Sequence, residues 1–176
     1  MYQITFPVIA LANTVNKIQL PGEHSVYDKS ARYYDDYYAF LDYDAAATKL
    51  RTLIAEHSPE ARTLLDVACG TGRYLGYLQE DFSVEGLDIN STLLQMSSAR
   101  CPNIPLHQAD MVDFDLEQQY DVVTCLFCSI GYMTELEGAE RAITRMAAHL
   151  KPGGVLIVEP WITPEQCWTD RVSSEV

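Results

Sequence analysis

The segment from Leu64 to Arg73 reads LLDVACGTGR, in which an apolar run carrying one acid, Asp66, breaks into two glycines one residue apart. Gly70 and Gly72 would lie in a turn that leads from a strand into a helix. Glycine has no side chain, so a ligand can approach the backbone, and N–H groups at the start of the helix point toward it. The spacing therefore predicts a ligand that contacts the main chain at this turn.

An acid ends the next apolar segment, VEGLD, at Asp88. A carboxylate at the end of the second strand can accept two hydrogen bonds from a ribose diol, which indicates a nucleoside cofactor. The dinucleotide fingerprint G-x-G-x-x-G needs a third glycine where this chain has Leu75, so a nicotinamide oxidoreductase is disfavoured. A simpler alternative for Asp88 is an acid that caps the following helix.

These residues need elements that hold them at one place, and the chain alternates apolar strand segments with helical ones. Helices are expected between the strands, and the Thr134–Glu137 spacing predicts a capping box before the last of them. This alternation predicts an α/β fold, a doubly wound, Rossmann-like and mostly parallel sheet with helices on both faces. The expected strands are 63–68, 83–89, within 104–111, 120–127 and 155–160.

Ligands of such sheets sit beyond the carboxyl ends of the strands. The residues that follow the third, fourth and fifth strands therefore join the candidate site: Asp110 and Met111, the segment 127–132, and Glu159. An acid in the position of Asp110 also commonly begins a turn, which is the plain alternative.

Composition limits the partners. The 176 residues carry a net charge of −13, which disfavours nucleic acid as a partner because nucleic-acid binders need a basic surface. The five cysteines form no disulfide framework, and no Lys or Arg precedes the apolar start, so a cytoplasmic protein is expected. Cys125 and Cys128 lack a second Cys/His pair, and buried thiols are expected rather than a metal site.

Four strings in this order, LLDVACGTGR, VEGLDIN, HQADMVDF and LKPGGVLIVEPW, resemble the class I S-adenosylmethionine-dependent methyltransferases. The resemblance covers residues 27–168, so a methyltransferase domain over 27–176 and an N-terminal extension over 1–26 are expected. CLFCSIGYM followed by VEPW is most similar to small-molecule N-methyltransferases, including amino-sugar N,N-dimethyltransferases. The resemblance implies S-adenosylmethionine as cofactor and a small-molecule methyl acceptor such as the amine of an amino sugar.

The resemblance also implies roles for single residues. Asp88 would hold the ribose hydroxyls, and Ile89 would pack on the adenine. Asp110 would accept a hydrogen bond from the adenine amino group, the backbone of Met111 would meet the ring, and Phe127 would lie beside the cofactor's amino group. The methionine part would be lined by Asp66, Ala68, Gly70 and Gly72.

Four further residues are implied around the reacting groups. Tyr27 and Tyr34 resemble lid tyrosines, although packing is an equally good reading of aromatic residues at helical spacing. Tyr132 stands where the amino-sugar enzymes carry a His. It can hydrogen-bond an amine, but its pKa near ~10 makes it a poor base at neutral pH. Glu159 is an alternative polar anchor for the acceptor.

Relatives in this family continue beyond the fifth strand with further strands, for which this chain has no room after Pro160. The sheet is therefore expected to lack its last strands and to leave an edge open, which a homodimer contact, another partner or residues 1–23 would cover. A catalytically incomplete cofactor-binding remnant or interaction module is the alternative function.

Overall fold

The computed structural model describes residues 31–159, with the side chains of Ala31, Arg32 and Tyr34 excepted. Its centre is a five-stranded sheet in the order β3-β2-β1-β4-β5, in which every neighbouring pair is parallel. The predicted parallel α/β sheet is thereby confirmed, and the strand order reverses between β1 and β4. The strands are β1 (Thr63–Val67), β2 (Ser83–Asp88), β3 (Leu106–Gln108), β4 (Tyr120–Cys125) and β5 (Leu150–Val158).

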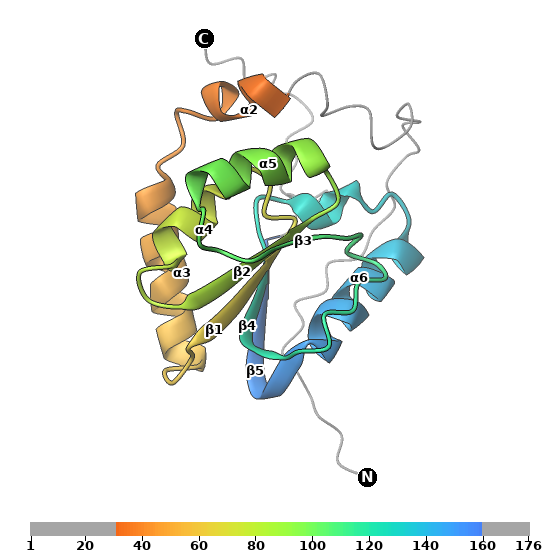
Figure 1. Ribbon diagram of the computed structural model, residues 1–176. Coiled ribbons are helices and arrows are strands. Elements are labelled where there is room, and N and C mark those ends of the chain that lie inside the picture. The colour runs from red at the N-terminus through yellow and green to blue at the C-terminus, as the bar shows by residue number, and fades with distance from the viewer. Residues whose placement is uncertain (1–30, 160–176) are drawn as a thin grey trace, which may run out of the picture.

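Helices cover both faces of this sheet, and α3 and α6 lie on opposite sides of it in Figure 1. One core packs α3, α4 and α5 against Leu64, Val84 and Val122, and the other packs α6 against Leu65 and Val123. The helices are α2 (Ala31–Tyr37), α3 (Tyr43–His57), α4 (Arg73–Leu78), α5 (Ser91–Arg100), α6 (Leu136–Ala148) and the short 3-10 helix η1 (Ser129–Tyr132).

The central strand β1 shows why this sequence forms such a sheet. Leu64 belongs to one core and Leu65 to the other, and both side chains are fully buried. Successive side chains of a strand point to opposite faces, so an apolar residue at each position suits a strand that is covered on both sides. Together these contacts fix the ends of the strands, which position the site.

Two details differ from the sequence-based expectation. β5 begins at Leu150 instead of 155, because the predicted stop at Lys151–Gly154 is absorbed as an irregularity in the pairing with β4, where Gly153 has a φ of 82°. The predicted Thr134–Glu137 capping box is wrong: the N-cap of α6 is Glu135, and its side chain makes no cap hydrogen bond.

The predicted domain boundary at 26/27 and the residues 1–30 and 160–176 lie outside the described residues. Within residues 31–159 the strands β3 and β5 form the two edges, and no further strand joins either of them. None of the described helices is both long and apolar enough to cross a membrane.

Candidate functional site

The turn between β1 and α4 takes the left-handed backbone conformation at three residues, with φ angles of 61° at Ala68, 56° at Gly70 and 74° at Gly72. A residue with a side chain seldom adopts this conformation, so Ala68 carries local strain of the kind found at binding sites. A Cβ atom built on Gly70 would meet no protein atom within 4 Å. The space beside Gly70 is therefore open, as the close approach of a ligand requires.

Gly72 has a different reason to be glycine. A Cβ atom there would lie 2.3 Å from Oγ of Ser97 and 3.1 Å from its Cβ, so a side chain would force α4 and α5 apart. Ser97 Oγ is also the one buried side-chain polar atom that lacks a hydrogen-bond partner among the described residues. A side chain at Gly72 would thus point into the protein, toward Ser97. The contact of Gly72 with a ligand stays a prediction.

Asp66 lies inside β1 with a side chain that is only 2% exposed. Its Oδ1 accepts a hydrogen bond of 2.7 Å from the hydroxyl of Thr124 on β4. Burial raises the pKa of Asp66 from 3.8 to about 7; the Thr124 hydrogen bond opposes this shift and the negative charge of Asp88 adds to it. Asp66 is therefore a buried acid that titrates near neutral pH at the floor of the turn.

Asp88 ends β2 and is 6% exposed. Its Oδ2 accepts from the backbone N–H of Gly70 and its Oδ1 from that of Asn90, each at 2.8 Å. Burial raises the pKa of Asp88, although these backbone hydrogen bonds partly offset the effect. The side chain of Asn90, not that of Asp88, caps α5. Asp88 thus joins the glycine turn to the start of α5, and Ile89 beside it is 40% exposed.

Asp110 follows β3 and begins a turn, which was the alternative to its role at the adenine. Its Oδ1 accepts from the backbone N–H of Val112 at 3.0 Å. Its backbone oxygen accepts from Asp113 and Phe114 at 3.2 and 3.1 Å. Met111 is partly buried against the core under α6. The turn accounts for one carboxylate oxygen of Asp110, and the adenine contacts of Asp110 and Met111 remain predictions.

Beyond β4 the backbone of Phe127 and Cys128 is again left-handed, with φ angles of 53° and 58°. The N–H of Phe127 donates a hydrogen bond of 2.7 Å to Oε2 of Glu159, and its ring packs edge-on against Tyr38 with centroids 4.8 Å apart. Glu159 therefore fixes the backbone of the segment that follows β4. Cys125 is fully buried as expected, whereas Cys128 is only partly buried.

The remaining predicted residues lie around this segment or outside the description. Tyr132 ends η1 and is 52% exposed, and burial of its remaining surface raises the pKa of its hydroxyl. Tyr27 lies outside the described residues, and Tyr34 lies in α2 with a side chain that is outside them too. Their predicted lid role therefore stays a prediction. Within residues 31–159, no cluster of three or more His, Cys, Asp or Glu side chains is arranged to hold a metal ion.

Sequence reasoning missed Asp35 of α2, whose carboxylate contacts the glycine turn. Thr71, between the two glycines, donates to Asp35 Oδ1 at 2.7 Å, and Arg73 and Arg100 form ion pairs with the same carboxylate. The only local signal was the acidic pair Asp35–Asp36 inside an aromatic run. Nothing in that pair tells which of the two acids would face the turn.

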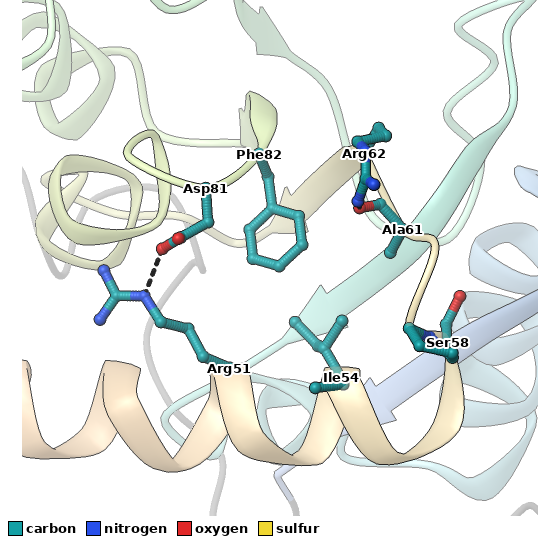
Figure 2. Close-up of a pocket in the computed structure, with 9 residues that line it drawn as sticks. Arg51, Ile54, Ser58, Ala61, Arg62, Asp81 and Phe82 are labelled. Carbon is teal, nitrogen blue, oxygen red and sulfur yellow. Dashed lines mark hydrogen bonds and ion pairs between the residues drawn. The ribbon is translucent and has the colours of Figure 1, made fainter.

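Two cavities lie at the opposite, amino-terminal ends of the strands. The first, of about 280 Å³, lies between α3 and the residues that lead into β1 and β2, where Arg51 and Asp81 form an ion pair of 2.6 Å (Figure 2). The second, of about 480 Å³, is lined by residues that precede β4 and β5, including His149. Neither includes Gly70, Asp66 or Asp88, so the candidate site is the open turn and not one of these cavities.

The chain matches the family model described as a methyltransferase domain over residues 64–154, which run from β1 into β5. A curated protein of Streptomyces fradiae, described as dTDP-3-amino-3,6-dideoxy-alpha-D-glucopyranose N,N-dimethyltransferase, is 45% identical over 125 residues, which are 70% of this chain and 49% of that protein. The chain spans about half the length of the curated relatives it matches.

Solved structures agree with this match. Streptomyces venezuelae DesVI superposes with a TM-score of 0.78 at 39% identity, covering 82% of this chain and 63% of that one. CalS10, an amino pentose methyltransferase from Micromonospora echinaspora solved with S-adenosylmethionine bound, superposes with a TM-score of 0.72 at 34% identity, covering 87% of this chain and 62% of that one. With the family model spanning half of the chain and the fold shared with these enzymes, the chain belongs to the S-adenosylmethionine-dependent methyltransferases.

Proposed function

We propose that the turn after β1 and the ends of β2 and β4 bind S-adenosylmethionine. The observation that carries this proposal is the environment of Gly70. Its missing side chain leaves open space, and its N–H donates to Asp88 at 2.8 Å. One hydrogen bond therefore joins the accessible backbone of Gly70 to Asp88, the acid proposed for the ribose hydroxyls. A nucleoside cofactor requires these two features side by side.

The charges at this edge suit the same ligand. S-adenosylmethionine carries a sulfonium and an ammonium group, and the carboxyl groups of Asp66 and Asp88 lie at the methionine and ribose ends of the proposed site. A cation beside Asp66 favours its ionised form and offsets the cost of its burial. The adenine side of the site would be completed by Ile89, Asp110 and Met111. The ring of Phe127 would lie beside the cofactor's amino group.

A matched pair of glycine variants tests the binding proposal. Gly70 and Gly153 both have positive φ and both leave the space of a Cβ open, but Gly153 lies in β5, within the irregular pairing with β4. An alanine at either position pays about 1–2 kcal/mol of backbone strain, so a loss of binding specific to Gly70→Ala reports a contact with the ligand.

Calorimetric titration with S-adenosylmethionine and S-adenosylhomocysteine measures this contact, with NAD as a control ligand. We expect the wild type and Gly153→Ala to bind both adenosyl compounds and not NAD, and Gly70→Ala to bind them at least about tenfold more weakly. Binding of NAD in place of S-adenosylmethionine, or equal affinity in both variants, would refute the proposal.

For the reaction we propose methyl transfer to the amine of a nucleotide-linked amino sugar. The support is the description of the relatives, which are amino-sugar N,N-dimethyltransferases at 39–45% identity. S-adenosylmethionine supplies a methyl group already activated on a sulfonium. The amine lone pair forms the new N–C bond while the C–S bond breaks with its electron pair going to sulfur, and the amine proton then leaves to solvent.

Alignment of the amine with the methyl group and exclusion of water are then the protein's main contribution. Because burial raises the pKa of Tyr132, its hydroxyl stays protonated at neutral pH and serves as a hydrogen-bond partner for the amine, not as a base. Glu159 acts through the backbone of Phe127, which it holds at 2.7 Å. Both roles are part of the proposal.

A labelled-methyl assay tests transfer separately from binding. The acceptors are a dTDP-linked 3-amino sugar and the same sugar nucleotide with a hydroxyl in place of the amine. We expect label only in the amine, and a rate about 10–100-fold lower in Tyr132→Phe, the cost of one hydrogen bond to a group that becomes charged. A chain that binds S-adenosylmethionine but labels neither compound is instead a cofactor-binding module without catalysis, which refutes the transfer proposal and leaves the binding proposal standing.

We also propose a cytoplasmic setting. All four described cysteines are free thiols: Cys69, Cys101, Cys125 and Cys128. Free thiols of this kind persist where glutathione and thioredoxin keep cysteines reduced. Detection of the native protein by cell fractionation tests this, and its recovery from the medium would contradict it.

A further inference from the structure

Three donors from three different elements meet at the carboxylate of Asp35. The Thr71 hydroxyl of the glycine turn donates to Oδ1 at 2.7 Å, and Nε of Arg73, the first residue of α4, donates to the same oxygen at 3.3 Å. Nη2 of Arg100, the last residue of α5, donates to Oδ2. The side chain of Asp35 is 15% exposed and those of Arg73 and Arg100 are 32% and 31% exposed, so these contacts are partly buried.

Arg100 also holds the glycine turn itself. Nη1 of Arg100 donates to the backbone oxygen of Thr71 at 2.5 Å and to its hydroxyl oxygen at 3.0 Å. Thr71 is itself 2% exposed and stands between Gly70 and Gly72. One guanidinium therefore bonds to both the main chain of the turn and the carboxylate on α2, a double contact that its planar fork geometry allows.

α2 is anchored a second time on the other side of the strand-order reversal. Tyr38, the residue after α2, packs edge-on against Phe127, which follows β4. The segment from Asp35 to Tyr38 thus runs from the end of β1 to the end of β4. Figure 1 shows α2 beyond the end of the sheet toward which β1 runs. This is the edge where the cofactor is proposed to bind.

The hydrogen bonds to Asp35 outweigh its partial burial. Burial alone would raise the pKa of this carboxyl, but the hydrogen bonds from Arg100, Thr71 and Arg73 lower it below its ordinary value. The group is therefore ionised at neutral pH, as a carboxylate that holds two guanidinium groups must be. Its sequence neighbour Asp36 is exposed.

We propose that Asp35 is a positioning residue that fixes the glycine turn through Thr71 and at the same time holds α2 over the cofactor, so that cofactor binding and docking of α2 favour each other. The proposal rests on the proposed function of this edge. It assigns to α2 a polar contact with the cofactor turn, in addition to the aromatic residues expected there. Thermodynamic linkage then requires reciprocity: the factor by which docked α2 raises cofactor affinity equals the factor by which bound cofactor favours docking of α2.

The test compares Asp35→Asn with Asp36→Asn, a matched change at the exposed neighbour. S-adenosylhomocysteine affinity is measured by calorimetry, and amide hydrogen exchange is followed across residues 31–37 and 68–73. We expect about tenfold weaker binding in Asp35→Asn, within the usual range of coupling, and no change in Asp36→Asn. Arg100→Gln should weaken binding similarly, and the double variant should lose less than the product of the two single effects.

Hydrogen exchange separates positioning from a general loss of stability. In the wild type, S-adenosylhomocysteine should slow exchange in 31–37, and in Asp35→Asn it should do so much less, while exchange in the β1 and β4 cores stays unchanged. Wild-type affinity in Asp35→Asn, or unchanged protection of α2 by the ligand, would overturn the proposal. Failure of the wild type to bind S-adenosylhomocysteine would instead overturn the proposed function. Even then, faster exchange at 68–73 in unliganded Asp35→Asn would still show that Asp35 holds the turn.

Discussion

Replacement of Asp66 by Asn should make the protein more stable at neutral and alkaline pH. The pKa of Asp66 is raised by burial from 3.8 to about 7. The folded chain therefore binds this proton more tightly than the unfolded chain does, so the contribution of Asp66 to stability is largest below pH 3.8 and falls as the pH rises toward 7. Above that pH the ionised, buried carboxylate is a constant penalty.

The size of the effect follows from the shift. One pKa unit corresponds to about 1.4 kcal/mol, so the full difference between low and high pH is about 4 kcal/mol. About 2–3 kcal/mol of it falls between pH 5 and pH 8. Asn has nearly the same shape, can still accept the hydrogen bond from Thr124 through its Oδ1, and has no charge to bury.

Urea unfolding of both proteins at pH 5, 6, 7 and 8 measures this difference. The free energy of unfolding of Asp66→Asn minus that of the wild type should rise by about 2–3 kcal/mol across the series, with Asp113→Asn, a change at an exposed carboxyl group, measured alongside as the control. A difference for Asp66→Asn that stays the same from pH 5 to pH 8 would refute the reasoning, because it would mean that Asp66 titrates alike in the folded and unfolded chains.

Three other outcomes follow from the described contacts. Asp88→Ala leaves the backbone amides of Gly70 and Asn90 without their acceptor. The free energy of unfolding in urea should therefore fall by about 1–3 kcal/mol for each amide, and cofactor affinity should fall too. Ser97→Ala removes a buried hydroxyl that lacks a partner among the described residues, so thermal unfolding should show a gain of about 1 kcal/mol. Light scattering should show self-association that grows with added salt, through the edges at β3 and β5; a monodisperse monomer at every salt concentration would contradict it.

The fold could be predicted from the sequence because its signals are local and repeated. Leu64 and Leu65 are adjacent apolar residues, and a strand buries both of them only when it is covered on both faces. The carboxyl ends of parallel strands then follow from the order of the elements, and so does the neighbourhood of Asp66, Gly70 and Asp88. The extent of β5 was less predictable, because a glycine-rich stop can be absorbed into strand pairing.

The side-chain contacts at the site could not be predicted in the same way. Asp35 and Asp36 are chemically identical neighbours, and they are distinguished by the contacts of Asp35 with Thr71, Arg73 and Arg100, all far along the chain. The role of Glu159 as an alternative polar anchor for the acceptor stays a prediction, and no sequence pattern indicated that its Oε2 would accept from the backbone N–H of Phe127 in the left-handed turn after β4. Local patterns name the residues at strand ends, whereas their partners depend on backbone geometry that forms only in the folded chain.

The length of helix α5 is constrained by contacts with the site at both of its ends. At its start, Asn90 is bonded to Asp88, and at its end, Arg100 is bonded to Thr71. Its ten residues, at about 1.5 Å each, act as a spacer between the proposed ribose acid and the middle of the glycine turn. One inserted residue would rotate Arg100 by about 100° and carry it away from Thr71. Among homologous chains that keep both contacts, substitutions on the outer face of α5 should be common and insertions or deletions within it rare.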